Sequence, residues 1–232
     1  MTAIIETLKL CRYFGTEDIK VRALHNIDLD IHQGEFTAII GPSGSGKSTL
    51  LHLIGGLDTP TSGQVNLSGV NIAEMSSRYL SDFRRDHIGF IFQAYNLIPV
   101  LSAEENIEYI LLLQGAPASE RKKRVMEMLS LLGLEGLAER RPAQLSGGQQ
   151  QRVAVARAMA SRPDIILADE PTANLDSRTG TELLEIMKAL NKDYNMTFLF
   201  STHDEKIMRM ARRLVYLRDG EIEKDEVKTP EP

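Results

Sequence analysis

The sequence predicts an α/β fold that combines a parallel-sheet core with an antiparallel β subdomain and an inserted α-helical subdomain. Apolar runs at residues 36–40 and 165–168 are typical of strands buried on both faces of a parallel sheet. Residues 27–31 alternate between apolar and polar side chains, which predicts an antiparallel strand with one face in water. From about residue 94 to 162 helical periodicity replaces strand signals, which indicates a helical insertion.

The remaining elements follow from the same periodicities. We expect further strands at 64–67, 88–92, 197–201 and 214–217, and helices at 76–86, 119–132, 177–194 and after His203. The dipeptide Asp219-Gly220 is typical of a hairpin turn. Residues 223–232 have almost no apolar content, so we expect a charged, mobile tail there.

A glycine-rich loop follows the first buried strand and precedes a helix that begins near Ser48. It fits the pattern G-x-x-x-x-G-K-[ST], whose backbone N–H groups point at phosphate oxygens, and it predicts the core of a P-loop NTPase. We expect Lys47 to contact the outer phosphates and Ser48 to bind Mg²⁺. A structural turn is the alternative, which the strand and helix on either side make improbable. The expected nucleotide contacts are Gly41, Pro42, Ser43, Gly44, Ser45, Gly46, Lys47, Ser48 and Thr49.

A second motif occupies residues 145–149. Ser146 and Gln149 fit the S-x-x-Q capping box that starts many ordinary helices. The adjacent glycines Gly147 and Gly148 are unnecessary for a cap, but they would let the backbone approach an anion closely at a helix N-terminus. The segment is therefore a candidate contact for a terminal phosphate.

A carboxylate pair, Asp169 and Glu170, follows the buried run at 165–168. Open α/β sheets bind ligands at the carboxyl ends of their strands. Asp169 can hold Mg²⁺ through water while Glu170 polarises the attacking water. Such a pair is otherwise often a solvated turn, and the two motifs before it favour the functional interpretation.

Residues 145–149 and the Gln-Gln-Arg that follows them resemble the signature of ABC-type ATPases, and the family's other motifs occur in its order. The resemblance implies that Gln93 senses Mg²⁺ and the attacking water and that His203 contacts the γ-phosphate. A single Gln or His at a strand end is otherwise often a turn residue. Asn174-Leu175-Asp176 resembles the aspartate loop that lines the interface between two subunits, although Asn174 replaces the small residue common there.

An aromatic pair near the N-terminus, Tyr13 and Phe14, precedes the glycine-rich loop by an interval similar to that of the adenine-stacking aromatic in relatives. We expect Tyr13 to stack on the base. The alternatives are that Phe14 stacks instead or that both residues belong to the core. Stacking tolerates any base, so discrimination among nucleotides would be weak.

Composition limits the class of protein. The chain has 232 residues, of which 42% are hydrophobic and 25% charged, enough for one large α/β domain. A net charge of −5 argues against nonspecific nucleic-acid binding. Cys11 is the only cysteine, which excludes an intrachain disulfide and favours a reducing compartment. Because no run approaches about 20 apolar residues, another polypeptide must supply any membrane span.

One phosphate loop and one signature indicate a single nucleotide-binding domain over residues 1–222, which we expect to hold half of each ATP site. Phosphoryl transfer needs charge neutralised on both sides of the phosphate, and the signature lies too far along the sheet to reach its own loop. The resemblance implies a head-to-tail homodimer with two sandwiched ATP molecules. Each would lie between the glycine-rich loop of one subunit and Ser146-Gly147-Gly148 of the other.

Residues 51–63 and 92–99 look like those of ATPases from bacterial lipoprotein-release and macrolide-export systems, and this resemblance suggests the partner. The resemblance implies a cytoplasmic protein on the inner face of the cell membrane, an integral membrane permease and, through the permease, a periplasmic adaptor. The apolar residues at 95–99 then line a groove for a permease helix, or they pack in the core.

Other functions share some or all of these motifs. A regulatory ATPase of the cell-division type, acting on envelope hydrolases without transport, would share every motif. An importer ATPase would share the family motifs as well. A DNA-repair or chromosome-organising ATPase would need coiled-coil or zinc-binding insertions, and the chain has neither the heptads nor the cysteines.

Overall fold

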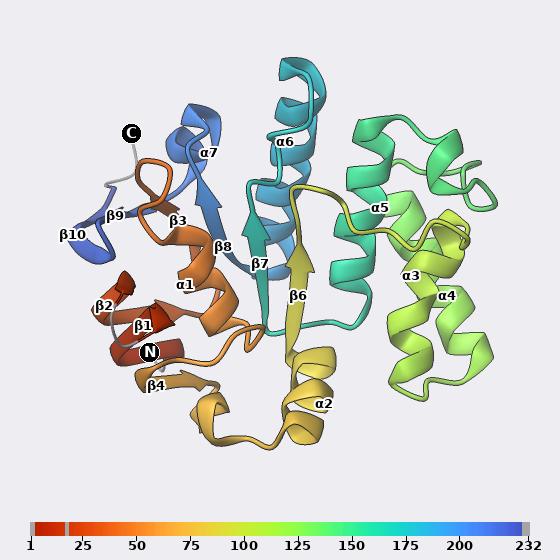
Figure 1. Ribbon diagram of the computed structural model, residues 1–232. Coiled ribbons are helices and arrows are strands. Elements are labelled where there is room, and N and C mark those ends of the chain that lie inside the picture. Colours follow the sequence, from red (N-terminus) through yellow and green to blue (C-terminus); the bar gives the residue numbers. More distant parts are fainter. Residues whose placement is uncertain (1–2, 17–18, 229–232) are drawn as a thin grey trace.

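The computed structural model describes residues 3–16 and 19–228 and contains two sheets (Figure 1). The larger sheet has the strand order β10-β9-β3-β8-β7-β6, with all neighbours parallel except the antiparallel pair β9 and β10. Its strands are β3 (Phe36–Ile40), β6 (Ile88–Ile91), β7 (Ile165–Asp169), β8 (Thr197–Thr202), β9 (Arg213–Arg218) and β10 (Glu221–Val227). The predicted parallel core is thereby confirmed.

Alternate side chains of the parallel strands enter two different apolar cores. In β8, Phe198 and Phe200 pack in the core formed with α5 (Gly147–Ala160) and α6 (Ser177–Tyr194). Leu199 belongs to the opposite core, formed with α1 (Lys47–Ile54) and the smaller sheet. Burial on both faces explains why these strands appear in the sequence as continuous apolar runs.

The smaller sheet is antiparallel, with strand order β2-β1-β4-β5. It carries the apolar face predicted from residues 27–31, and that face packs against α1. The carbonyl of Ala23 in β2 and the loop before α1 also lie close together. The elements of this region are β1 (Ala3–Thr16), β2 (Ile19–His32), β4 (Ser62–Leu67), β5 (Val70–Asn71) and the short helix η1 (Ile72–Glu74).

The helices between β6 and β7 lie side by side beyond the β6 edge of the large sheet (Figure 1). They form one continuous core with α6 through apolar residues that include Ile107, Met128 and Val153. The first of them starts at a capping box between Ser102 and Glu105. The helices not yet given are α2 (Ser77–His87), α3 (Ala103–Leu113), α4 (Ala118–Leu131), η2 (Pro142–Gln144) and α7 (Glu205–Met210).

The C-terminal segment corrects one prediction. Residues 223–227 do not form a mobile tail, because β10 extends to Val227 and pairs with β9 after a turn in which Asp219 and Gly220 have φ of 49° and 79°. Residues 229–232 of the predicted tail lie outside the described residues. Backbone pairing and ion pairs hold the strand where apolar content is low.

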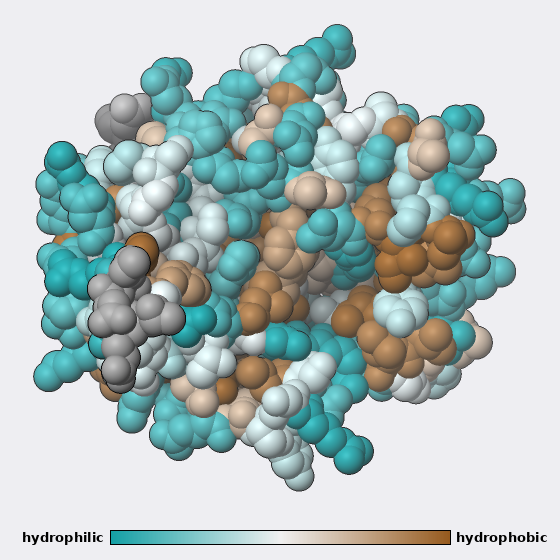
Figure 2. Space-filling view, in the orientation of Figure 1, coloured by the Kyte–Doolittle hydropathy of each residue, from teal (hydrophilic) through white to brown (hydrophobic). Residues whose placement is uncertain are grey.

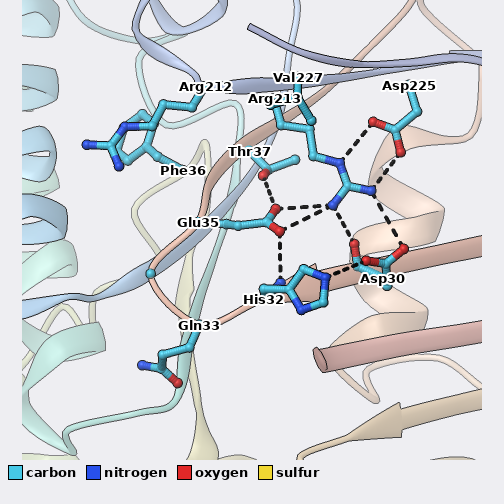
Figure 3. Close-up of a pocket in the computed structure, with 11 residues that line it drawn as sticks. Asp30, His32, Gln33, Glu35, Phe36, Thr37, Arg212, Arg213, Asp225 and Val227 are labelled. Carbon is cyan, nitrogen blue, oxygen red and sulfur yellow. Dashed lines mark hydrogen bonds and ion pairs between the residues drawn. The ribbon is translucent and has the colours of Figure 1, made fainter. Parts of the chain in front are cut away.

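Arg213 forms one of those ion pairs through two hydrogen bonds to the same carboxylate (Figure 3). Its guanidinium binds both carboxylate oxygens of Asp225, at 2.9 and 2.7 Å, and lies 3.2 Å from Glu35 and 3.8 Å from Asp30. The bond to Asp225 raises the pKa of Arg213 further above its ordinary value. These residues line a cavity of about 600 Å³. The strand β10, which looks like a polar tail in the sequence, is therefore held to the sheet by an ion pair as well as by backbone pairing.

Candidate functional site

The loop of residues 41–48, called the P-loop below, joins the carboxyl end of β3 to α1. Gly46 begins α1 with φ of 104°, and a Cβ there would lie 2.5 Å from the carbonyl oxygen of Ala23. Within the described residues, no side chain caps the start of α1. The N–H groups of a first helical turn have no intrahelical acceptors, so this N-terminus suits an anion such as phosphate.

Lys47 places a cation inside this loop. Its side chain is 8% exposed, and Nζ donates hydrogen bonds of 2.9 Å to the carbonyl oxygens of Gly41 and Pro42. An ammonium group has three N–H donors, so one remains for a ligand. Gly41 itself approaches β9 closely, because a Cβ there would lie 2.0 Å from the Leu217 carbonyl oxygen.

Ser48 and Asp169, the two residues expected to hold Mg²⁺, lie next to each other. The Ser48 hydroxyl donates a 2.9 Å hydrogen bond to Asp169 Oδ1 across the P-loop and the end of β7. Hydroxyl and carboxylate oxygens are ligands that Mg²⁺ accepts, together with water and phosphate oxygens. No group of three or more His, Cys, Asp or Glu side chains in the described parts of the chain could hold a metal alone. The two oxygens therefore fit a metal that is shared with a nucleotide.

Glu170 follows Asp169 in a strained conformation, with φ of 46°. Its N–H donates to the Ser201 carbonyl at 2.9 Å, and its carboxylate oxygens lie 2.7 Å from His203 Nδ1 and 3.2 Å from the Thr202 hydroxyl. Strain of this kind persists only where surrounding bonds enforce it and is concentrated at functional sites. The structure brings the predicted residues Glu170 and His203 together.

A layer of hydroxyl groups behind Glu170 was not predicted. Thr202 Oγ1 also accepts a 2.9 Å bond from the N–H of Asp204, whose Oδ2 accepts a 2.7 Å bond from Thr172. Thr202 is completely buried. Its position in the sequence could have identified Thr202 as a site residue, because it ends a parallel strand at the edge of the sheet where ligands bind.

Gln93 lies in a turn two residues beyond the end of β6, and its side chain is exposed. Its carbonyl oxygen accepts a 2.8 Å hydrogen bond from the Asn174 side chain. Among the described residues no hydrogen bond or ion pair joins the Gln93 side chain to Ser48 or Asp169. The structure thus connects Gln93 to the aspartate loop (residues 174–176) rather than directly to the P-loop.

The signature, residues 145–149, begins α5. Ser146 and Gln149 form the capping box that the sequence allowed, with bonds of 3.3 and 2.9 Å. The two glycines also have close neighbours in the same chain. A Cβ at Gly147 would lie 2.9 Å from Tyr95 Oη, and one at Gly148 would lie 2.2 Å from Thr179 Cγ2. Packing within the subunit therefore contributes to the requirement for glycine here.

The signature and the P-loop do not meet within one chain. Figure 1 shows the start of α5 beyond β6, whereas the P-loop joins β3 to α1 at the other side of β8 and β7. Over residues 3–16 and 19–228 no hydrogen bond or ion pair links the two motifs. The fold therefore separates two groups that were both expected at the phosphate.

The strand segment that carries the aromatic pair runs beside the P-loop. Tyr13 pairs with Arg22 of β2, one residue before the Ala23 that contacts Gly46. The Tyr13 ring is half-buried, and its hydroxyl lies 2.8 Å from His25 Nδ1. Phe14 is 41% exposed, under the Arg12 guanidinium at 4.5 Å. The choice between the two rings stays a prediction.

Asp176 has a local structural role. It is the N-cap of α6, where its Oδ1 accepts hydrogen bonds from the N–H groups of Arg178 and Thr179, and its Oδ2 accepts one from the Thr179 hydroxyl. These bonds, the side-chain bond above all, lower the pKa of Asp176. Its predicted contact with a nucleotide stays a prediction.

A P-loop at a helix N-terminus, a lysine within it, a serine–aspartate pair and a glutamate directly after that aspartate define a P-loop NTPase. The model of the ABC transporter family matches residues 24–173. The chain belongs to this family of ATPases and is an ABC transporter ATP-binding protein.

Curated relatives agree over nearly the whole chain. An uncharacterized ABC transporter ATP-binding protein of Thermotoga maritima is 46% identical over 223 residues, covering 96% of this chain and 95% of that protein. A macrolide export ATP-binding/permease protein, MacB, of Mannheimia succiniciproducens is 48% identical over 227 residues, covering 98% of this chain. The chain spans 35% of the length of that MacB protein.

Solved structures have the same fold. The ATP-binding cassette MJ0796, in a dimeric post-hydrolysis state bound to ADP and Pi, matches with a TM-score of 0.90 and 43% identity, over 98% of this chain and 100% of that one. The uncharacterized ABC transporter ATP-binding protein MJ0796 of Methanocaldococcus jannaschii is 49% identical over 210 residues, 89% of each chain. The cbiO1 protein of Clostridium perfringens matches with a TM-score of 0.86 and 28% identity, over 98% of this chain and 89% of that one.

Proposed function

We propose that this protein dimerises head to tail around two ATP molecules and drives a separate membrane permease of the lipoprotein-release or macrolide-export type. The separation of the P-loop from the signature within one chain supports the dimer, because a second copy can supply the missing half of each site. The dimeric structure of MJ0796 with ADP and Pi also supports dimer formation. ATP is then part of the interface, and its hydrolysis opens it.

Each half-site would assign distinct tasks to its residues. Lys47 and the start of α1 would bind the outer phosphates, and Ser48, Asp169 and Gln93 would hold Mg²⁺, whose positive charge would neutralise the phosphates. Glu170 accepts the proton of the attacking water, because its carboxylate is fixed from β8 by the bonds described above. His203 contacts the γ-phosphate. Ser146, Gly147 and Gly148 of the other subunit complete the site.

A groove beside the Gln93 loop supports the permease partner. The cavity has a volume of about 360 Å³ and apolar walls that include Phe90, Phe92 and Tyr109. Four exposed apolar residues lie on α3 or shortly before it, and only Tyr109 of these also lines the cavity: Val100, Tyr109, Leu112 and Leu113, which are 69%, 43%, 52% and 50% exposed. Figure 2 shows brown side chains gathered around α3 on this face. Exposed apolar groups beside a groove are typical of a protein interface.

The segment at 95–99 contributes less to this surface than its sequence suggested. Leu97 packs against the core, and the Tyr95 hydroxyl donates to the Asn174 carbonyl oxygen at 3.3 Å. Substitutions at these two positions would therefore disturb the subunit itself. The partner surface is better tested at Val100.

A membrane partner would provide the membrane-spanning segments of the proposed complex. None of the helices in residues 3–16 and 19–228 has the length and apolarity needed to span a bilayer. MacB proteins combine an ATP-binding part with a permease, and this chain matches 35% of the length of one of them. We therefore infer a location on the cytoplasmic face of the membrane, with a periplasmic adaptor reached only through the permease.

The test is affinity isolation of the tagged protein from membranes of its own cells in the presence of ATP. Val100→Glu should abolish co-purification of the permease, because it places a charge on the apolar surface. Val21→Glu is the matched control, since Val21 is a 60% exposed valine on β2. Both variants should hydrolyse ATP at the rate of the unchanged protein. Retention of the permease by Val100→Glu, or its loss from Val21→Glu, would contradict the proposed surface.

A further inference from the structure

The aspartate loop and the Gln93 loop are joined by two hydrogen bonds. Asn174 Nδ2 donates to the Gln93 carbonyl oxygen at 2.8 Å, and the Tyr95 hydroxyl donates to the Asn174 carbonyl oxygen at 3.3 Å. Both bonds cross between segments about eighty residues apart in sequence. A small residue at 174 could not make the first of them. The sequence departs here from the pattern it otherwise follows, and the departure creates a contact.

The Gln93 loop depends on such contacts for its shape. Tyr95 and Asn96 are consecutive non-glycine residues with φ of 59° and 50°, a conformation that costs energy. The Arg157 guanidinium of α5 donates to the carbonyl oxygens of both, at 3.1 and 2.6 Å. Arg157 therefore holds the distal half of the loop, whereas the side-chain hydrogen bond that Gln93 itself receives within the described residues comes from Asn174.

Asn174 is well placed to act as an anchor. It lies two residues before Asp176, whose three side-chain hydrogen bonds fix the start of α6. Gln93, in contrast, lies in an exposed turn outside β6. A hydrogen bond between a fixed and a less constrained segment restricts the latter, so the Asn174 amide limits where the Gln93 backbone can lie.

We propose that Asn174 is a positioning residue for ATP hydrolysis, which acts by holding the Gln93 main chain so that the Gln93 side chain can reach the reaction site. The proposal rests on the role given to Gln93 in the proposed function. It also predicts a consequence for the dimer. A shift of the aspartate loop, which carries Asp176, would also move the Gln93 turn. The two loops would therefore change position together when the dimer forms or opens.

The test is steady-state ATP hydrolysis by the purified protein, with Asn174→Asp in the unchanged protein and in Gln93→Ala. A carboxylate cannot donate to the Gln93 carbonyl oxygen and repels it. Asn174→Asp should lower kcat about tenfold, equivalent to about 1.4 kcal/mol, while KM for ATP changes less than about twofold. In Gln93→Ala the same change should lower kcat less than about twofold, because the side chain to be positioned is absent.

The control is Asn71→Asp, which adds the same charge at the N-cap of η1, keeps the bond from the Ala73 N–H and loses one amide donor. It should leave kcat unchanged. Asn174→Ala should lower kcat in the same direction as Asn174→Asp, and it adds no charge. In the Glu170→Gln background, Asn174→Asp should still form the ATP-dependent dimer on size-exclusion chromatography.

Several results would overturn the proposal. Unchanged kcat in Asn174→Asp would show that the bond is dispensable. An equal loss with and without the Gln93 side chain would place the effect elsewhere, and loss of the dimer would place it at the subunit interface. Unchanged turnover in Gln93→Ala would remove the role of Gln93 and this inference with it. The measurement needs no membrane partner, so failure of the permease proposal leaves it intact.

Discussion

Glu170 Oε1 lies 2.7 Å from His203 Nδ1, so the carboxylate after β7 is held by the residue after β8. The two strands are parallel neighbours, and their carboxyl ends bring these side chains to one edge of the sheet. The Thr202 hydroxyl fixes the second oxygen of Glu170 from the same strand. The orientation of the proposed general base is therefore set by sheet register.

Lys47 and Glu170 should fail in different ways when substituted. Lys47→Ala removes the cation inside the P-loop and should abolish ATP binding. Glu170→Gln keeps the shape of the side chain and removes the base, so hydrolysis should fall about 100- to 10,000-fold while ATP still binds. Nucleotide binding and turnover of the two variants would be measured side by side.

The same pair tests the dimer. With ATP bound and hydrolysis blocked, Glu170→Gln should elute from a size-exclusion column as a dimer, and Lys47→Ala should remain a monomer. The column run without ATP is the control for both. A monomeric Glu170→Gln protein at saturating ATP would contradict the proposed sandwich.

Thr202 should affect catalysis by positioning Glu170, and its hydroxyl also accepts a hydrogen bond from the Asp204 N–H. Thr202→Val keeps the branched shape and removes the hydroxyl, so kcat should fall about tenfold, while KM for ATP changes little. Thr202→Ser restores the hydroxyl and should recover most of the rate. Because Thr202 is completely buried, thermal melting of both variants checks for a general loss of stability. Equal kcat in Thr202→Val and the unchanged protein would show that the hydroxyl does not position the base.

Most of the fold could be predicted because burial leaves a periodic trace in the sequence. The parallel strands are apolar on both faces, and α6 was predicted with the bounds observed, 177–194. β10 has no such apolar pattern, because ion pairs such as that between Asp225 and Arg213 hold it in place. The length of β1 was not predicted either. Its register shifts between Thr7 and Leu10, where Lys9 has φ of 45°, and this breaks the alternation.

The candidate site was also predictable only in part. Short motifs predicted the P-loop, Asp169 and Glu170, because their chemistry requires particular residues at fixed spacing. The Thr202 hydroxyl and the Asn174 bond to Gln93 depend on segments that meet only in the folded chain. The fit of Gly148 against Thr179 is likewise a tertiary contact. Local sequence patterns carry no information about such pairs.

Tyr13 and Phe14 can be separated by nucleotide affinity. If the Tyr13 ring stacks on adenine, Tyr13→Ala should weaken ATP binding about 5- to 150-fold, the usual range for one base–aromatic stack. Tyr13→Phe keeps the ring and loses only the hydroxyl contact with His25, so affinity should be nearly unchanged. Titration with a fluorescent ATP analogue would measure both. Loss of affinity in Phe14→Ala alone would assign the stack to Phe14 instead.

Arg213 should stabilise the fold without contributing to catalysis. Its side chain is 12% exposed and has Asp30, Glu35 and Asp225 around it. Arg213→Ala would leave these carboxylates without their cation, and the free energy of unfolding should fall by about 2 kcal/mol. This is below the roughly 3–5 kcal/mol of a fully buried pair, because Asp30 and Asp225 are partly exposed to water. Urea denaturation would give the value.

Arg212 provides the matched control, since it is the neighbouring arginine, its side chain is exposed, and no ion pair involving it occurs among the described residues. Arg212→Ala should change the free energy of unfolding by less than about 0.5 kcal/mol. In Arg213→Ala the strand β10 should also become accessible to proteases before the rest of the domain, because Asp225 no longer anchors it. ATP turnover of the folded variant should match that of the unchanged protein. Equal stability of the two arginine variants would show that backbone pairing alone holds β10 in place.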